Sequence, residues 1–165
     1  MKTYEQVFRY AMQMELDGHN FFKEKAELFN NPTTQKLFLT LSKTEMEHYK
    51  YLKNQLDKYI ATDSFDMSPE VLDRDENIFE EREKSEHIEE TLKESDIPDI
   101  TILRMAYLIE RDFKEFYQNA TENVDNEDIK AIFSRLSKWE EGHEKLFKGE
   151  YDRRMKEYMT LPWGG

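Results

Sequence analysis

The sequence predicts an all-α protein, a four-helix bundle made of two repeated helical hairpins. Three observations lead to this prediction. Four segments carry apolar residues at helical spacing, and none is a clear candidate for a strand. Only 5 glycines and 4 prolines occur in 165 residues, which permits long helices. One half of the chain also repeats the other. The length suits a single domain with one sizeable core.

The first hairpin is predicted over residues 3–60. Its first helix covers about 3–29 and ends at the sequence "NNP", because the residue before a proline disfavours helical backbone. Its second helix covers about 33–60. An acidic crossover at 61–97 follows, with at most one or two short helical turns. Because this connection is long for a compact domain, it is predicted to span the length of the bundle.

The second hairpin is predicted over residues 98–157. Its two helices cover about 98–124 and 127–157, with the same apolar periodicity as the first pair. The remaining residues, 158–165, contain the sequence "LPWGG" and are predicted to form an irregular tail.

An internal repeat relates the two hairpins. Sliding residues 4–56 along by 95 positions places them on 99–151 without a gap, and 15 of the 53 positions are identical. Ordinary composition gives only about 3 or 4 matches. The identical pairs include Arg9/Arg104, Ala11/Ala106, Glu15/Glu110, Phe21/Phe116, Phe38/Phe133, Leu41/Leu136, Glu45/Glu140 and His48/His143.

Each hairpin carries one glutamate and one Glu-x-x-His motif inside an otherwise apolar helix face. Within each hairpin the lone glutamate stands 30 residues before the motif. Neighbours three, four and seven positions away are mostly apolar, which places these polar residues in the predicted core. The six residues are Glu15, Glu45, His48, Glu110, Glu140 and His143.

Four buried carboxylates need a compensating charge. An isolated buried carboxylate costs several kcal/mol, and no lysine or arginine shares these faces. Two divalent cations would balance four carboxylates, with the histidines binding as neutral imidazoles. Mixed histidine and carboxylate ligands suit iron and manganese. The sequence therefore predicts a buried two-metal site; the alternative is a metal-free bundle with partly exposed glutamates.

Composition excludes several other classes of protein. The chain has 24 basic and 36 acidic residues and a net charge of -12, which argues against nucleic-acid and anionic-membrane surfaces. Cysteine is absent, which excludes disulfides, thiolate metal sites and a cysteine nucleophile. No stretch has the features of a signal peptide or a membrane span, so a soluble cytoplasmic protein is expected.

With these motifs the chain resembles the rubrerythrin and ferritin-like di-iron carboxylate superfamily, over both hairpins. The sequence "EEGHEKLF" at 140–147 is similar to the fourth helix of rubrerythrins. The resemblance implies a ferritin-like four-helix bundle in which the six residues bind two iron ions, with manganese or a mixed pair as alternatives. It further implies reduction of hydrogen peroxide or dioxygen, a role in oxidative stress, and an external electron donor such as a rubredoxin-type protein. A homodimer is one assembly that it allows.

Two features depart from the rubrerythrin pattern. Rubrerythrins carry a cysteine-rich rubredoxin domain, which a chain without cysteine lacks. They also carry a further glutamate one turn after the ligand of the third helix, where this chain has Phe113 and, at the equivalent position of the repeat, Gly18. These departures leave open a ferroxidase or iron-handling protein without sustained turnover, and a purely structural helical protein.

Several residues close in sequence to the predicted ligands are interpreted first as structural or surface residues. His19 and Glu144 are the candidates for additional ligands, whereas Glu47 and Glu141 are interpreted as helix-surface charges and His87 as a solvated residue of the crossover. The aromatic residues near the motifs are interpreted as core residues, with a redox relay as the alternative. They are Tyr49, Tyr107, Tyr117 and Trp139.

Overall fold

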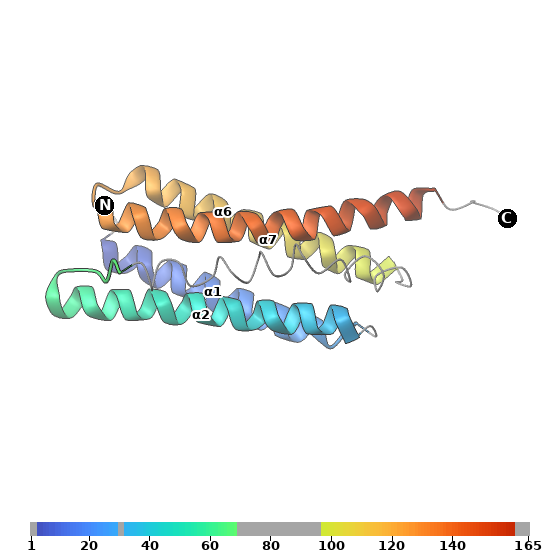
Figure 1. Cartoon of the computed structure of the whole chain (residues 1–165), viewed down its shortest axis with the longest axis horizontal. Coiled ribbons are helices and arrows are strands. Elements are labelled where there is room, and N and C mark those ends of the chain that lie inside the picture. The colour runs from blue at the N-terminus through green and yellow to red at the C-terminus, as the bar shows by residue number, and fades with distance from the viewer. Residues whose placement is uncertain (1–2, 30–31, 69–96, 161–165) are drawn as a thin grey trace.

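The computed structural model describes residues 3–29, 32–68 and 97–160. Within these ranges the chain forms four α-helices and no strand. The helices lie side by side along the long axis of the molecule, α1 antiparallel to α2 and α6 antiparallel to α7 (Figure 1). Their bounds are Tyr4–Ala26 for α1, Pro32–Thr62 for α2, Ile97–Asn123 for α6 and Glu127–Met159 for α7. The predicted all-α four-helix architecture is confirmed.

The helix ends differ from the predicted ends by up to three residues. Helix α1 ends at Ala26 rather than residue 29, and α7 continues to Met159, so the predicted tail begins as helix. Helices α2 and α6 end and begin at opposite ends of the bundle, as a crossover along its length requires (Figure 1). The helical turns predicted inside the crossover and the sequence "LPWGG" fall on residues 69–96 and 161–165, outside the described residues. The single-domain organisation stays a prediction.

Side-chain caps fix where α1 and α7 begin. Thr3 Oγ1 accepts a hydrogen bond from the Gln6 backbone N–H at 3.3 Å, and Gln6 Oε1 accepts one from Thr3 N–H at 2.9 Å. At α7, Asn126 Oδ1 accepts from the backbone N–H groups of Asp128 at 2.9 Å and Ile129 at 3.1 Å. Each cap of this type stabilises a helix by about 1 kcal/mol. The caps thereby help to set which face of α1 and α7 points inward.

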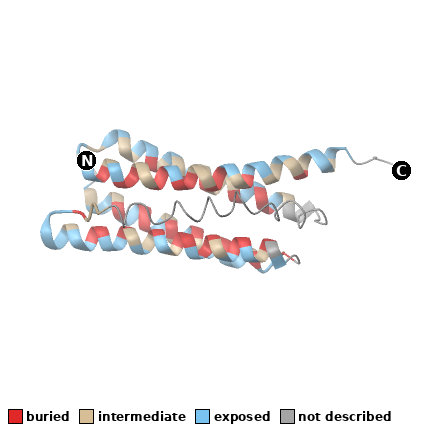
Figure 2. Cartoon of the chain, viewed as in Figure 1, coloured by how far each residue is buried: buried red, intermediate tan, exposed pale blue. Residues whose placement is uncertain are grey.

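The core consists of two apolar clusters, one toward each end of the bundle. Buried residues run along the facing sides of all four helices (Figure 2). In one cluster, Phe22 stacks on Phe147 with ring centroids 5.7 Å apart, and Phe38 lies 5.5 Å from Phe147. In the other, Phe8 lies 5.2 Å from Phe133. On every helix the glutamates and histidines predicted to bind metal fall between the residues of the two clusters.

Gly18 and Phe113 pack against each other although they are equivalent positions of the repeat. A Cβ atom added at Gly18 would lie 2.9 Å from Phe113 Cε2 and 3.5 Å from Glu45 Cγ. The absence of a side chain on α1 thus makes room for the Phe113 ring from α6 beside Glu45. An exact repeat would place either two glycines or two phenylalanines here, leaving a void or an overlap.

We expect Gly18→Ala to lower the free energy of unfolding by about 1 kcal/mol. The overlap with Phe113 costs about 1–3 kcal/mol, and the better helix propensity of alanine offsets only about 1 kcal/mol of that cost. In a Phe113→Leu background the same change should be neutral or stabilising, because the ring no longer fills the space. Urea unfolding of the four proteins in this double-mutant cycle measures the coupling.

Gly149→Ala is the matched control, since a Cβ atom there would meet nothing within 4 Å. It should raise the free energy of unfolding by about 0.5–1 kcal/mol through helix propensity alone. An equal cost of Gly18→Ala in both backgrounds would rule out Phe113 as the cause.

Candidate metal centre

The six residues predicted to bind metal come together in the middle of the bundle. Glu15 lies on α1, Glu110 on α6, and the two Glu-x-x-His motifs on α2 and α7. The four glutamates are 0 % exposed and the two histidines 1 %. The helical spacing thus places every one of these side chains in the interior, as the apolar stripes predicted.

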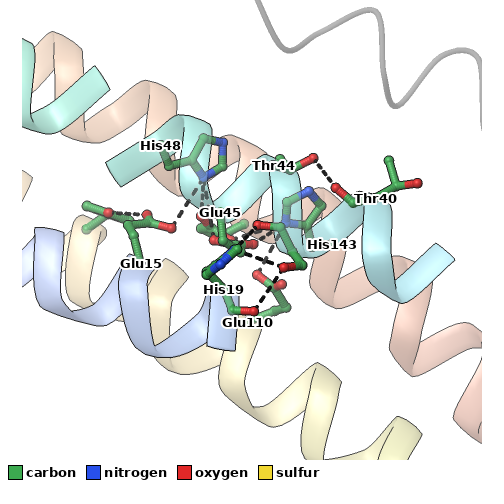
Figure 3. A network of polar contacts seen from close by, with 11 residues as sticks. Glu15, His19, Thr40, Thr44, Glu45, His48, Glu110 and His143 are labelled. Carbon is green, nitrogen blue, oxygen red and sulfur yellow. Dashed lines mark hydrogen bonds and ion pairs between the residues drawn. The ribbon is translucent and has the colours of Figure 1, made fainter. Parts of the chain in front are cut away.

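Two overlapping groups of four residues are present. One contains Glu15, Glu45, His48 and Glu140, and the other contains Glu45, Glu110, Glu140 and His143. Within each group, one ligand atom from each residue lies within 4.8 Å of the others. Glu45 and Glu140 belong to both groups, so the two groups adjoin at these carboxylates. Figure 3 shows Glu45 lying between His48 and His143.

The His48 imidazole faces the first group through its Nδ1 atom. This atom lies 3.4 Å from Glu15 Oε2, 3.6 Å from Glu45 Oε2 and 3.1 Å from Glu140 Oε1. Three carboxylates from three different helices therefore converge on one imidazole nitrogen.

The His143 imidazole repeats this arrangement in the second group. Its Nδ1 atom lies 3.3 Å from Glu110 Oε2, 3.2 Å from Glu140 Oε2 and 3.5 Å from Glu45 Oε1. The two histidine rings are 6.2 Å apart between centroids and tilted by only 20°. The centre thus has the approximate twofold symmetry of the sequence repeat.

The four carboxyl groups of this centre differ in how readily they ionise. Burial, together with the charges of Glu140 and Glu45, raises the pKa of Glu15 and of Glu110 well above the usual range. Burial also acts to raise the pKa of Glu45 and of Glu140, but the proton donors around them outweigh it and lower both. These opposite shifts place a carboxyl that holds its proton more tightly next to one that releases its proton more readily, once in each hairpin.

His143 also carries a proton at neutral pH. Burial lowers its pKa, but the contacts with the Glu140 and Glu45 carboxylates outweigh this effect and raise the pKa to about 9. Metal binding to such a site must release protons, because carboxylate and imidazole coordinate in their deprotonated forms.

The residues present fit a pair of metal ions. Five buried carboxylate oxygens form no hydrogen bond of regular geometry within the described ranges, although four of them lie 3.1–3.6 Å from a histidine Nδ1. The four are Glu15 Oε2, both oxygens of Glu45 and Glu140 Oε1, and the fifth is Glu110 Oε1. Buried polar atoms normally have partners, and oxygens that converge without one are typical of a cation site. Their number, together with two imidazoles, suits two ions of the iron or manganese type.

Tyr117, interpreted from the sequence as a core residue, lies in the core and also contacts the centre, which that interpretation did not foresee. Its hydroxyl is fully buried and donates a hydrogen bond to Glu15 Oε1, across from α6 to α1. The equivalent position of the repeat is Phe22, which cannot form this bond with Glu110. The only sequence signal was the placement of Tyr117 two turns after Glu110 on the same helix face.

The two candidates for additional ligands lie outside both groups. His19 Nδ1 lies 2.7 Å from the Ser42 carbonyl oxygen and 2.9 Å from Ser42 Oγ, which ties α1 to α2. Glu144 accepts hydrogen bonds from Arg111 Nε at 2.8 Å and from Lys114 Nζ at 2.6 Å. Both residues therefore hold neighbouring helices together.

The surface glutamates behave as interpreted from the sequence. Glu47 pairs with Lys50 at 3.9 Å, and Glu141 pairs with Lys145 at 3.1 Å, with side chains 49 % and 43 % exposed. His87 lies outside the described residues.

The family assignment follows from the same region of the chain. The family model for rubrerythrin matches residues 6–151, which include all four helices up to the middle of α7. The chain belongs to the rubrerythrin family. The predicted ferritin-like bundle is thereby confirmed, and the buried carboxylate and histidine cluster lies within the matched region. Comparisons with curated proteins and with solved structures find no match.

This member of the rubrerythrin family holds its cluster inside helices of mixed polarity. Among the described residues, no helix is both long enough and apolar enough to cross a membrane.

Glu144→Gln should lower the free energy of unfolding by about 1 kcal/mol at pH 7, after allowance for the partial exposure of Arg111. Burial acts to raise the pKa of Glu144, but Lys114 and Arg111 outweigh it and lower the pKa. A lowered pKa contributes stability above the pKa of the unfolded chain, and this contribution is lost as the pH falls through the folded value. The difference between native and variant should therefore shrink progressively as the pH falls below the pKa of an unfolded glutamate, about 4.3.

Thermal or urea unfolding between pH 3 and pH 8 measures this dependence. Glu141→Gln, a neighbour on α7 with an exposed ion pair, is the control and should change stability little at any pH. A deficit of Glu144→Gln that persists undiminished in acid would contradict the ion-pair explanation.

Proposed function

We propose that this rubrerythrin-family protein binds two iron ions and reduces hydrogen peroxide or dioxygen with electrons from an external donor. Manganese or a mixed pair is the alternative metal content. One observation carries the proposal: the two groups of ligands share Glu45 and Glu140, which is the arrangement that a pair of neighbouring metals requires.

Each residue has a definite place in this proposal. Glu15 and His48 would hold one ion and Glu110 and His143 the other, with Glu45 and Glu140 between them. A metal pair held in this way supplies two electrons to an oxygen-based oxidant. Six protein ligands leave coordination positions open for that oxidant.

The surrounding residues control water and protons. The two apolar clusters enclose the ligands from both ends of the bundle, which excludes bulk water and strengthens the electrostatic interactions within. The Tyr117 hydroxyl holds its proton against Glu15 and fixes the orientation of that carboxylate. Reduction of peroxide to water consumes protons, so a proton donor next to a ligand suits this chemistry.

Electrons would come from a separate molecule. The chain has no cysteine and so no rubredoxin-type iron site of its own. A one-electron carrier such as a rubredoxin-type protein fits the role.

Phe113 favours a second candidate function, a ferroxidase or iron-handling protein without sustained turnover. Its ring lies over Gly18 and next to Glu45, where it presents an apolar wall rather than another anionic ligand. A centre with fixed ligands would oxidise its metals once and regain the divalent state slowly.

Replacing a shared ligand should cost more metal than replacing a surface glutamate. Glu45→Ala and Glu140→Ala each remove a carboxylate from both groups, so we expect both variants to retain less than half of the native metal content. Glu47→Ala and Glu141→Ala are controls on the same two helices and should retain all of it. Elemental analysis of protein loaded anaerobically with ferrous iron measures the content. Equal loss in all four variants would mean that the face assignment is wrong.

Steady-state consumption of peroxide separates the two candidate functions. With an artificial one-electron donor in excess, the metal-loaded protein should consume many equivalents of peroxide, and Glu140→Ala should consume none above background. Consumption that stops after one equivalent per metal pair would favour the ferroxidase alternative over the peroxidase.

A further inference from the structure

One of the two histidines carries an aromatic ring on its face. The Trp139 indole stacks on the His48 imidazole with centroids 5.1 Å apart and an angle of 13° between the planes. Trp139 is 5 % exposed and directly precedes Glu140 on α7. Trp139 on α7, an easily oxidised side chain, is therefore in contact with His48 on α2.

A second oxidisable ring continues from the indole. Tyr51 lies edge-on to Trp139 with centroids 6.3 Å apart and planes at 68°. Unlike Trp139, Tyr51 is only partly buried. The series His48, Trp139, Tyr51 thus runs from the centre to the outer layer of the bundle.

The sequence repeat does not preserve this series on the other side of the centre. The position equivalent to Trp139 is Thr44, and the position equivalent to Tyr51 is Leu146. The repeat therefore does not carry the Trp139 and Tyr51 pair over to the His143 side. The ligands keep the symmetry of the repeat, while the aromatic series breaks it.

Tyr117 is the other oxidisable ring at the centre, but within the part of the chain that the structure describes its own ring contacts are with phenylalanines. Its ring neighbours are Phe116, at 5.4 Å, and Phe133, at 5.7 Å. Phenylalanine is not oxidised at the potentials that proteins reach, so an electron that left Tyr117 would not be replaced through these rings.

We propose that Trp139 is an electron relay that passes single electrons to the metal centre through His48. The proposal rests on the function proposed above and adds the residue through which electrons enter. It also predicts that the two metal positions are reduced unequally, since only the His48 side has the relay.

The electron count with dioxygen shows where the relay acts. Reduction of dioxygen to two waters takes four electrons and four protons. Two electrons come from a pair of divalent metals that each rise by one oxidation state. Trp139 gives a third and becomes an indole radical cation, and the external one-electron donor gives the fourth. The same donor then returns Trp139 to the neutral indole, and the protons come from solvent.

The surroundings of Trp139 keep the oxidised form on the indole. Its Nε1 atom is buried and has no hydrogen-bond partner within the described ranges, so the radical cation has no base to receive its proton. Burial raises the pKa of Tyr51 to about 12, so this phenol keeps its proton at neutral pH. Tyr51 packs edge-on against Trp139 and is only partly buried, so its ring is the neighbour through which an electron from the external donor would reach the indole.

Radical spectroscopy tests the relay directly. A Trp163→Phe background leaves Trp139 as the single tryptophan of the two in the chain. The protein is loaded with ferrous iron, exposed to dioxygen without reductant, and frozen within milliseconds for electron paramagnetic resonance. We expect an organic radical whose hyperfine pattern changes when the tryptophan is deuterated in the indole ring. Ascorbate added before freezing should abolish it.

Trp139→Phe is the decisive variant, because phenylalanine preserves a stacked ring but cannot be oxidised. It should keep the native metal content and lose the radical. Tyr117→Phe is the matched control and should retain the radical. A radical that survives in Trp139→Phe, or that disappears only in Tyr117→Phe, would overturn the proposal.

Two further readouts separate failure of the relay from failure of the proposed function. Oxygen uptake and metal oxidation without a tryptophan radical overturn the relay and leave the function in place; absence of oxygen uptake overturns both. Laser photo-oxidation of the metal-free protein tests the indole surroundings independently. It should give the radical cation of Trp139 with its Nε1 proton still bound. Prompt formation of the deprotonated neutral radical would contradict the statement that the oxidised indole keeps this proton.

Discussion

The burial of four carboxylates between two apolar clusters is the constraint on which the rest of this structure depends. Charges in such a place are tolerated only with close compensation. In the metal-free protein, the raised pKa values of Glu15, Glu110 and His143 favour bound protons that would provide it, and in the proposed holo form two cations would replace them. The compact packing of Phe22, Phe38 and Phe147 on one side and of Phe8 and Phe133 on the other holds these groups together despite their repulsion.

Much of this arrangement could be predicted because helical periodicity is a local property of the sequence. The spacing of Glu45 and His48 fixed their shared face, and the repeat at 95 residues extended the argument to Glu140 and His143. The helix ends were harder to predict, since the apolar pattern of α1 continues through Phe29 although the helix stops at Ala26. Phe29 is buried from a turn, so burial did not imply helix there.

The differences between the two halves could not be predicted, because they depend on which side chains meet across the bundle. The Tyr117 hydroxyl reaches Glu15, which is 102 positions away and on a different hairpin. Gly18 and Phe113 form a small and large pair only because equivalent positions of the repeat face each other near its approximate twofold axis. No spacing rule along one helix contains this information, and the same holds for the stacking of Trp139 on His48.

The residues that the repeat preserves and the residues found in only one half have different roles in the proposed chemistry. The proposed pair of metals would need equivalent ligands, and the residues that would bind them, Glu15 with Glu110 and His48 with His143, are ones that the repeat preserves. Electrons and protons, in contrast, need only one route each. Tyr117 supplies a proton donor next to Glu15 alone, and Trp139 supplies an oxidisable ring next to His48 alone. Both lie against the same group of ligands, the one that contains Glu15 and His48, so proton and electron supply would converge on the same metal position.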